Sequence, residues 1–102
     1  MQIDINDAGS TATVVLNGRL DIAGADAVAL PLATLSGAKN AIRVDMAKVT
    51  FIASIGLRHL VAAAKAVGRR GGTLTLINPN PAVVEVITTS GLNDLLPIEQ
   101  GA

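Results

Sequence analysis

In the middle of the chain, a strand pattern passes into a helix pattern over the stretch Asp45-Met46-Ala47-Lys48-Val49-Thr50-Phe51-Ile52-Ala53-Ser54-Ile55-Gly56-Leu57-Arg58-His59-Leu60. Its first two residues end the run of residues 41–46, which is short, mostly apolar and typical of a strand. After a link over residues 47–52, apolar residues recur at helical spacing from Ser54 to Gly68. The predicted helix has one apolar stripe, formed by Leu57, Leu60, Val61, Ala64 and Val67.

Toward the N-terminus, the pattern changes to that of a hairpin followed by a helix. Ile3 and Ile5 alternate with polar residues, and residues 11–16 are rich in strand formers, with the turn signal of residues 7–10 between them. Apolar residues at helical spacing then predict a helix over about residues 23–36. Pro31 lies inside this span, so we expect a kink or a late start there.

Toward the C-terminus, residues 73–77 form a clear strand pattern, and a last helix follows it. Asn80 is a good N-cap for that helix and Pro81 fits its first position, where no backbone donor is needed. Gly91 is well placed to end the helix. Residues 95–98 can add a short final strand.

The element order is therefore ββαβαβα, with a possible final β. Strands that alternate with helices after an opening hairpin indicate an α/β fold, with a mixed sheet of four to five strands and about three helices. The length of 102 residues fits one domain, residues 1–102, and no linker or repeat divides it.

Composition narrows the class of function. Half of the residues are apolar but Phe51 is the only aromatic one, so the core must be aliphatic. The net charge is zero, which does not suit a nucleic-acid binder. There is no cysteine, no signal peptide pattern and no apolar run long enough for membrane insertion. These features predict a cytoplasmic protein, and covered apolar faces would leave it a monomer when free.

The central stretch resembles the signature of the STAS domain, the fold of bacterial anti-sigma-factor antagonists. In that signature an acidic strand end and an aromatic–aliphatic pair precede Asp-Ser-Ser-Gly-Leu at a helix start, and residues 45–60 match it closely. Gly18-Arg19-Leu20-Asp21 and Ser90-Gly91-Leu92 are similar to two weaker markers of the family. The resemblance covers nearly the whole chain and implies a STAS-like single domain.

The resemblance also implies a function that depends on Ser54, which falls on the phosphorylated position of the antagonists. The unphosphorylated form would bind an anti-sigma factor or a related GHKL-type serine kinase, phosphate would abolish binding, and a phosphatase would reset the serine. The chain departs from the family pattern at Ala53, where Asp is usual, and at Ile55, where Ser or Thr is usual. Ser54 is therefore the single acceptor in this loop.

Two roles are open for Ser54 on physical grounds. A serine at a helix start is a favoured N-cap, worth typically about 1 kcal/mol. A phosphate at the same place would add about −1.5 to −2 charge. The positive end of the helix dipole would tolerate it, so the fold would survive while a docked partner would not.

The predicted partner surface surrounds this serine. The resemblance places Asp21 near the serine loop, although Asp21 also suits the cap of the preceding helix. Small and basic residues continue the surface along the outer face of the helix that Ser54 starts, although a solvated face would look the same. The predicted partner-binding residues are Asp21, Ala53, Ser54, Ile55, Gly56, Arg58, Ala62 and Lys65.

No enzymatic chemistry is indicated. His59 is the only histidine and lies on a different side of the helix from Ser54, so no base is predicted beside this hydroxyl. One histidine and no cysteine do not supply the usual ligands of a transition-metal site, and no cofactor is predicted. An acyl or phosphoryl transferase using Ser54 is a remote alternative. The main alternative is a constitutive STAS subunit of a larger assembly, such as a lipid-transport ABC ATPase complex or a stress-signalling complex.

Overall fold

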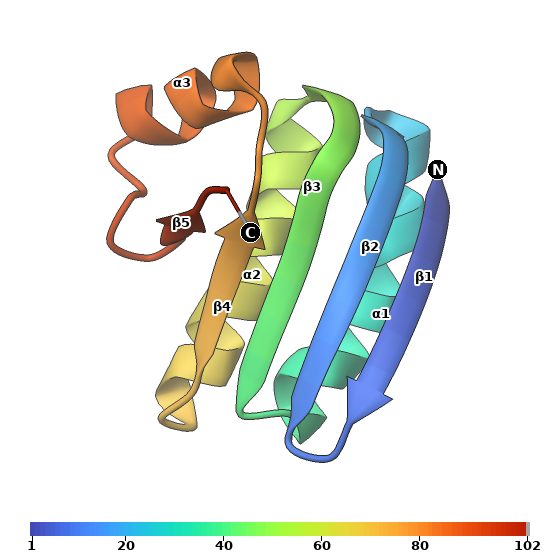
Figure 1. Ribbon diagram of the computed structural model, residues 1–102, viewed down its shortest axis with the longest axis vertical. Coiled ribbons are helices and arrows are strands. Elements are labelled where there is room, and N and C mark those ends of the chain that lie inside the picture. Colours follow the sequence, from blue (N-terminus) through green and yellow to red (C-terminus); the bar gives the residue numbers. More distant parts are fainter. Residues whose placement is uncertain (102) are drawn as a thin grey trace.

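The computed structural model describes residues 1–101 and has one sheet with helices on one of its faces (Figure 1). The elements alternate as the sequence predicts, and the final strand is present. In chain order they are β1 (Gln2–Ala8), β2 (Thr11–Leu20), α1 (Ile22–Ala38), β3 (Ala41–Ile52), α2 (Ser54–Arg69), β4 (Thr73–Ile77), α3 (Pro81–Thr89) and β5 (Ile98–Glu99).

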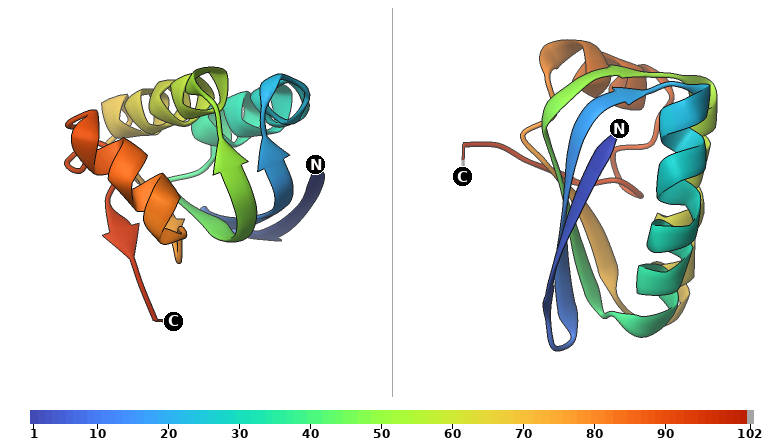
Figure 2. Two further views of the ribbon diagram at one scale, coloured as in Figure 1. Left: turned by 90° about the horizontal axis from the view of Figure 1, so that it is seen from above. Right: turned by 90° about the vertical axis from the view of Figure 1, so that its right-hand side faces the viewer.

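The five strands lie in the order in which they occur in the chain, β1-β2-β3-β4-β5. β1 and β2 form the antiparallel hairpin, and each later strand is parallel to the one before it. Parallel neighbours need a crossover, and α1 and α2 supply it on the same side of the sheet (Figure 2). α3 lies at the end of the sheet where β2 and β3 finish (Figure 1). This is the mixed α/β fold that the sequence predicts.

The core fills the space between the sheet and the α1–α2 layer. Alternate residues of the strands point into it, as a half-covered sheet requires. From the helices, Val28 and Leu32 of α1 meet Leu60 and Val67 of α2 there. The predicted stripe of α2 is slightly rotated, because Leu57 and Val61 are only half-buried and Gly56 and Ala63 are buried in their place.

Both central strands are longer than predicted. β2 continues to Leu20, and β3 runs on to Ile52 through the stretch expected to be a link. The pairing between them shifts between Val15 and Asn17 and again between Gly18 and Arg19. These irregularities break the simple alternation of apolar residues, which explains why the sequence pattern ended the strands too early.

The other boundaries differ by a few residues. α1 begins at Ile22 and runs through Pro31 to Ala38, so the proline causes no late start. The last strand is Ile98–Glu99 rather than residues 95–98. Asn80 caps α3 as predicted, and Gly91 follows it with a φ of 70°, which suits glycine after a helix.

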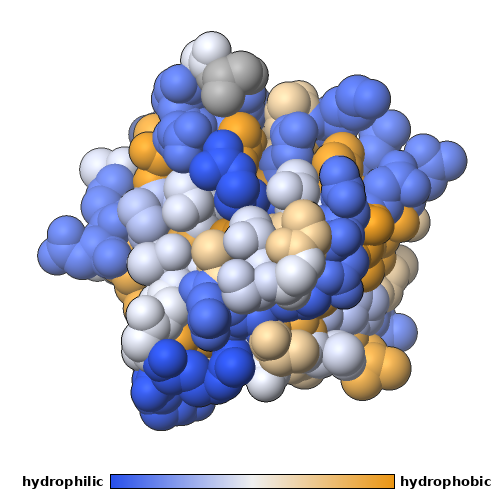
Figure 3. All heavy atoms as spheres, turned by 60° about the horizontal axis from the view of Figure 1, so that its bottom comes forward, coloured by the Kyte–Doolittle hydropathy of each residue, from blue (hydrophilic) through white to orange (hydrophobic). Residues whose placement is uncertain are grey.

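The two long helices also end side by side. The guanidinium of Arg70, just after α2, donates hydrogen bonds to the carbonyl oxygens of Ser36 (3.1 Å) and Lys39 (2.8 Å) at the end of α1. Lys39 in turn binds the Asp7 carboxylate of the hairpin. Hydrophilic residues cover much of this end of the molecule, and hydrophobic ones form separate groups there (Figure 3). Within residues 1–101 no helix has the length and apolar character needed to cross a membrane.

Candidate functional site

Four elements meet at the opposite end of the sheet. Leu20 at the end of β2 pairs with Ile52 at the end of β3, and α1 and α2 start directly after these strands. The Ala53 N–H donates to the Leu20 carbonyl oxygen over 2.8 Å, which fixes the start of α2 against β2. The segments around Asp21 and Ser54 are therefore neighbours, although they are far apart in the sequence.

Ser54 is the first helical residue of α2 and not its N-cap. The N-cap is Ala53, whose backbone is extended (φ −93°, ψ 165°) and whose carbonyl oxygen accepts the first helical hydrogen bond, from Leu57 N–H (3.1 Å). The capping role considered for Ser54 is therefore wrong. Its side chain is exposed, and its hydroxyl makes no hydrogen bond to any of the described residues. This hydroxyl is open to a modifying enzyme.

The first turn of α2 differs from the starts of the other helices. Asp21 caps α1 by accepting from Gly24 N–H (2.9 Å), and Asn80 caps α3 by accepting from Val83 N–H (2.9 Å). No side chain caps α2. The first N–H groups of any helix have no partner within that helix, so those of Ser54, Ile55 and Gly56 remain available to an acceptor at this end.

Gly56 holds the helix close to β2. A Cβ atom at this position would lie 2.9 Å from the Leu20 carbonyl oxygen and 3.1 Å from the Leu20 Cβ. Gly56 is also buried. The geometry therefore gives Gly56 a packing role, and its predicted contact with a partner stays a prediction.

A charged and aromatic cluster lies at the same end of the sheet as Ser54. The Arg19 guanidinium lies over the ring of Phe51, 4.4 Å from its centroid, and Arg19 Nε is 3.7 Å from Asp21 Oδ2. The hydrogen bond from Gly24 N–H lowers the pKa of Asp21 below its ordinary value, and the charge of Arg19 lowers it further. Asp21 therefore stays ionised and both caps α1 and orients Arg19.

Large apolar side chains are exposed around the same end. Phe51 is 41% exposed and Val86 of α3 is 38% exposed, and together they line a shallow pocket of about 190 Å³. Ile22, beside Asp21, is 79% exposed. This apolar rim was not predicted from the sequence. The available signal was that the single aromatic residue of the chain directly precedes the Ser54 loop.

The remaining predicted residues lie along the outer face of α2. Arg58 is exposed one turn after Ser54, and Ala62 and Lys65 follow it on the exposed side toward the far end of the helix. The structure thus brings Asp21, Ala53, Ser54 and Ile55 together, with Arg58 at their edge. Ala62 and Lys65 lie further away.

His59 does not contribute to the surroundings of Ser54. It lines the groove between α1 and α2, together with Ala29 and Ala62. A general base must lie within hydrogen-bond reach of the hydroxyl it activates, and no described side chain does so here. The described residues also contain no group of three or more His, Cys, Asp or Glu side chains that could hold a metal ion. The geometry suits modification of the serine and docking of a partner.

A family comparison supports this reading of the fold. The family model described as "Mlab, STAS domain" matches residues 3–97. The chain belongs to the STAS domain family. Its resemblance to the STAS signature at residues 45–60 is therefore confirmed, and Ser54 lies within the matched region.

Other STAS proteins are similar over nearly the whole chain. The anti-sigma-B factor antagonist of Bacillus subtilis is 24% identical over 98 residues, which cover 96% of this chain and 90% of that protein. The unphosphorylated anti-sigma factor antagonist SpoIIAA is 21% identical, with a TM-score of 0.86 over 99% of this chain and 89% of that one. The phosphorylated form of Bacillus SpoIIAA is 20% identical, with a TM-score of 0.81 over 99% of this chain and 92% of that one. The STAS fold is thus shared along the full length.

Proposed function

We propose that this protein is an anti-sigma-factor antagonist whose unphosphorylated form binds an anti-sigma factor or a related GHKL-type serine kinase. Phosphorylation of Ser54 releases this partner, and a phosphatase restores binding. The protein acts as a binding module and not as an enzyme, in the cytoplasm where transcription is controlled. The observation that carries the proposal is the exposed and unbonded hydroxyl of Ser54 at the uncapped start of α2.

The phosphate would be tolerated by the fold. It brings about −1.5 to −2 charge and three acceptor oxygens to a helix start whose N–H groups are unpaired. The positive end of the α2 dipole favours negative charge at this place. Phosphorylation should therefore leave the domain folded, so its effect falls on the partner.

The phosphate on Ser54 would prevent partner binding through charge repulsion and steric block. Its footprint is centred on Ser54 and Ile55, with the exposed Phe51 and the ionised Asp21 beside them. Arg58, Ala62 and Lys65 extend the footprint along α2 toward an acidic rim on the partner. A doubly charged group in the middle of such a surface must lose its water when the partner docks, and this costs much of the binding energy.

The similar proteins support the assignment of this chain as an antagonist. The curated relative is named an anti-sigma-B factor antagonist, and SpoIIAA has been solved in both unphosphorylated and phosphorylated forms. Ala53 and Ile55 differ from the usual residues of the family signature. Because both side chains flank Ser54, we expect the kinase for this chain to recognise it through neighbouring residues such as Phe51 and Asp21.

Affinity capture from the native lysate tests the proposal, with wild type, Ser54→Ala, Ser54→Gln and Ser54→Glu as baits. Gln matches Glu in size without the charge, so it separates repulsion from bulk. We expect wild type and Ser54→Ala to retain a GHKL-type kinase or anti-sigma factor and Ser54→Glu to lose it. Retention of the same partners by all four baits would contradict the switch. It would favour the constitutive subunit of a transport or stress-signalling assembly.

A further inference from the structure

The outer face of α1 is apolar and uncovered. Ile22 is 79% exposed and Leu30 is 74% exposed, and Asp26 between them is the only charged residue of the helix. A helix that is apolar on all sides is normally buried. The expectation of a monomer rested on covered apolar faces, and α1 does not meet that condition.

An alanine-lined groove lies beside this face. α1 and α2 run in the same direction side by side (Figure 2). The groove between them measures about 500 Å³ and is lined by small residues such as Ala29, Ala33, Ala62 and Ala66. Small side chains let another helix or a large apolar side chain come close to this layer.

The outer face of α2 is basic, whereas the single charge on that of α1 is the carboxylate of Asp26. Arg58, Lys65 and Arg69 are exposed along it. Asp26 and Arg58 each lie four residues after the first residue of their helices. The two helices start side by side after the Leu20–Ile52 pair and end side by side at the Arg70 hydrogen bonds. Asp26 and Arg58 therefore lie at the same level along the helix axes. Within residues 1–101 neither of them forms an ion pair.

We propose that this two-helix face binds a second copy of the chain. A two-fold axis parallel to the helices would place α1 of each copy against α2 of the other. It would leave the position of every residue along the helix axes unchanged. Asp26 would then face Arg58 of the second copy, and Leu30 would face its Ala62 and the alanine groove. Each contact occurs twice, as an isologous dimer requires.

The charges select this arrangement over the other two-fold packing. An axis perpendicular to the helices would place α2 against α2 in antiparallel orientation, so that Arg58 of each copy faced Lys65 of the other. Like charges in direct opposition cost binding energy. In the proposed arrangement Lys65 lies level with the small Ala33 and Thr34 of the second copy, which leave its ammonium group a path to solvent.

The size of the face indicates a weak dimer. Two helices of sixteen or seventeen residues present a face about 24 Å long and about 20 Å wide. Two such faces bury about 1,000 Å² in total, at the low end for a specific interface. We therefore expect dissociation in the micromolar range.

Sedimentation velocity across a wide concentration range tests the proposal. Wild type should shift from monomer to dimer, and Leu30→Glu should remain a monomer at every concentration. Because Leu30 is exposed in the monomer, circular dichroism should show Leu30→Glu to be folded. Val86→Glu is the matched control, an equal change at an exposed apolar residue outside this face, and it should dimerise like wild type. A wild type that is monomeric even in the millimolar range would overturn the proposal.

A charge exchange tests the arrangement itself. Asp26→Arg alone would face Arg58 of a second copy, and Arg58→Asp alone would face Asp26, so each variant should remain monomeric. In a mixture the two variants should form a heterodimer, because each contact then joins opposite charges. One contact is the wild-type pair of Asp26 with Arg58, and the other has its two charges exchanged. Failure of the mixture to associate, with wild type dimeric, would refute the pairing of α1 with α2.

This inference does not rest on the proposed function. Arg58 belongs to both surfaces, so a second copy and the signalling partner would compete. Sedimentation of the purified chain reports only self-association, and capture by the Ser54 baits reports only the switch. The two proposals can therefore fail separately.

Discussion

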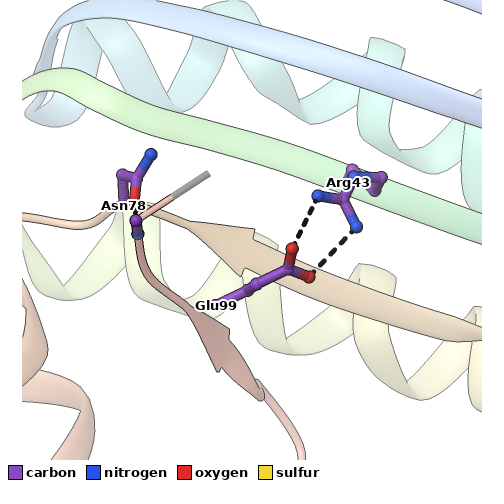
Figure 4. Close-up of polar contacts among 4 residues, drawn as sticks. Arg43, Asn78 and Glu99 are labelled. Atoms are coloured by element: carbon purple, nitrogen blue, oxygen red, sulfur yellow. Dashed lines mark hydrogen bonds and ion pairs between the residues drawn. The ribbon is translucent and has the colours of Figure 1, made fainter.

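Arg43 and Glu99 form a bidentate ion pair that links β5 to the central strand β3. Arg43 Nη1 lies 3.1 Å from Glu99 Oε2, and Arg43 Nη2 lies 3.1 Å from Glu99 Oε1 (Figure 4). Arg43 pairs with Thr75 of β4, so its guanidinium reaches across β4 to β5. β5 has only two residues, and this contact adds a side-chain tie to its short ladder.

This ion pair predicts a pH dependence of stability. The hydrogen bonds and charge of Arg43 lower the pKa of Glu99 below its ordinary value of 4.5. A carboxylate with a lowered pKa stabilises the fold above that ordinary value, and the contribution is lost as the pH falls through the pKa of the folded state. Wild type should therefore melt at a higher Tm than Glu99→Gln at neutral pH, by a small margin because both side chains are partly exposed.

The difference in Tm between wild type and Glu99→Gln should disappear in acid, as thermal melts at a series of pH values would show. Glu85→Gln is the matched control, since Glu85 is exposed on α3 and forms no ion pair within residues 1–101. A Tm difference between wild type and Glu99→Gln that persisted well below pH 4.5 would rule out this role of the ion pair.

Two glycines of α1 should respond in opposite ways to alanine. A Cβ at Gly24 would lie 2.0 Å from the Arg19 carbonyl oxygen, whereas a Cβ at Gly37 meets no atom within 4 Å. Gly24→Ala should cost about 2 kcal/mol or more, because backbone must move. Gly37→Ala should gain about 0.5–1 kcal/mol through helix propensity. Urea unfolding of both variants measures this, and equal effects would show that Gly24 is not held by close packing.

Arg70 should stabilise the fold although it is exposed. Its two hydrogen bonds satisfy carbonyl oxygens at the end of α1, so Arg70→Met should lower the free energy of unfolding by about 1 kcal/mol. Its neighbour Arg69 makes no such bond, and Arg69→Met should have little effect in the same denaturant titration. If both variants unfold alike, the hydrogen bonds to Ser36 and Lys39 contribute nothing measurable.

Charge at Ser54 should change stability in a direction opposite to its effect on binding. Ser54→Glu puts a negative charge at the positive end of α2 and should gain about 0.5 kcal/mol, while Ser54→Lys should lose a similar amount. Differential scanning calorimetry of the two variants beside Ser54→Gln would detect this order. A Ser54→Glu protein that melts well below wild type would mean that the switch acts by unfolding.

Phe51 should contribute to partner binding more than to folding. It is exposed three residues before Ser54, and the Arg19 guanidinium lies over its ring. Phe51→Ala should weaken binding of the captured partner at least tenfold, as is typical of a central aromatic side chain in an interface. Its Tm should stay close to that of wild type. Unchanged affinity, measured by biolayer interferometry, would place the interface elsewhere.

Much of the fold could be predicted because its elements follow simple periodicities. The spacing of apolar residues revealed α2, and Asn80 with Pro81 marked the start of α3 to the residue. The ends of β2 and β3 could not be predicted, because register shifts near Gly18 interrupt their alternation. The late start considered for Pro31 was wrong, since α1 begins at Ile22 and continues through the proline.

The candidate site was only partly predictable. The motif around Ser54 located it, and the capping role of Asp21 was one of the two roles considered. Whether Ser54 or Ala53 occupies the cap depends on one backbone position, which no pattern of residue types determines. The stacking of Arg19 on Phe51 depends on the pairing of β2 with β3 beyond the register shifts, so it required the structure.

The most direct test of the central claim is isothermal titration calorimetry of the captured partner against this chain, unphosphorylated and phosphorylated on Ser54. Mass spectrometry would establish the site and extent of modification. The account predicts binding by the unphosphorylated chain, no detectable binding by the phosphorylated chain, and full recovery after phosphatase treatment. Equal affinity of both forms, with Ser54 fully phosphorylated, would contradict it.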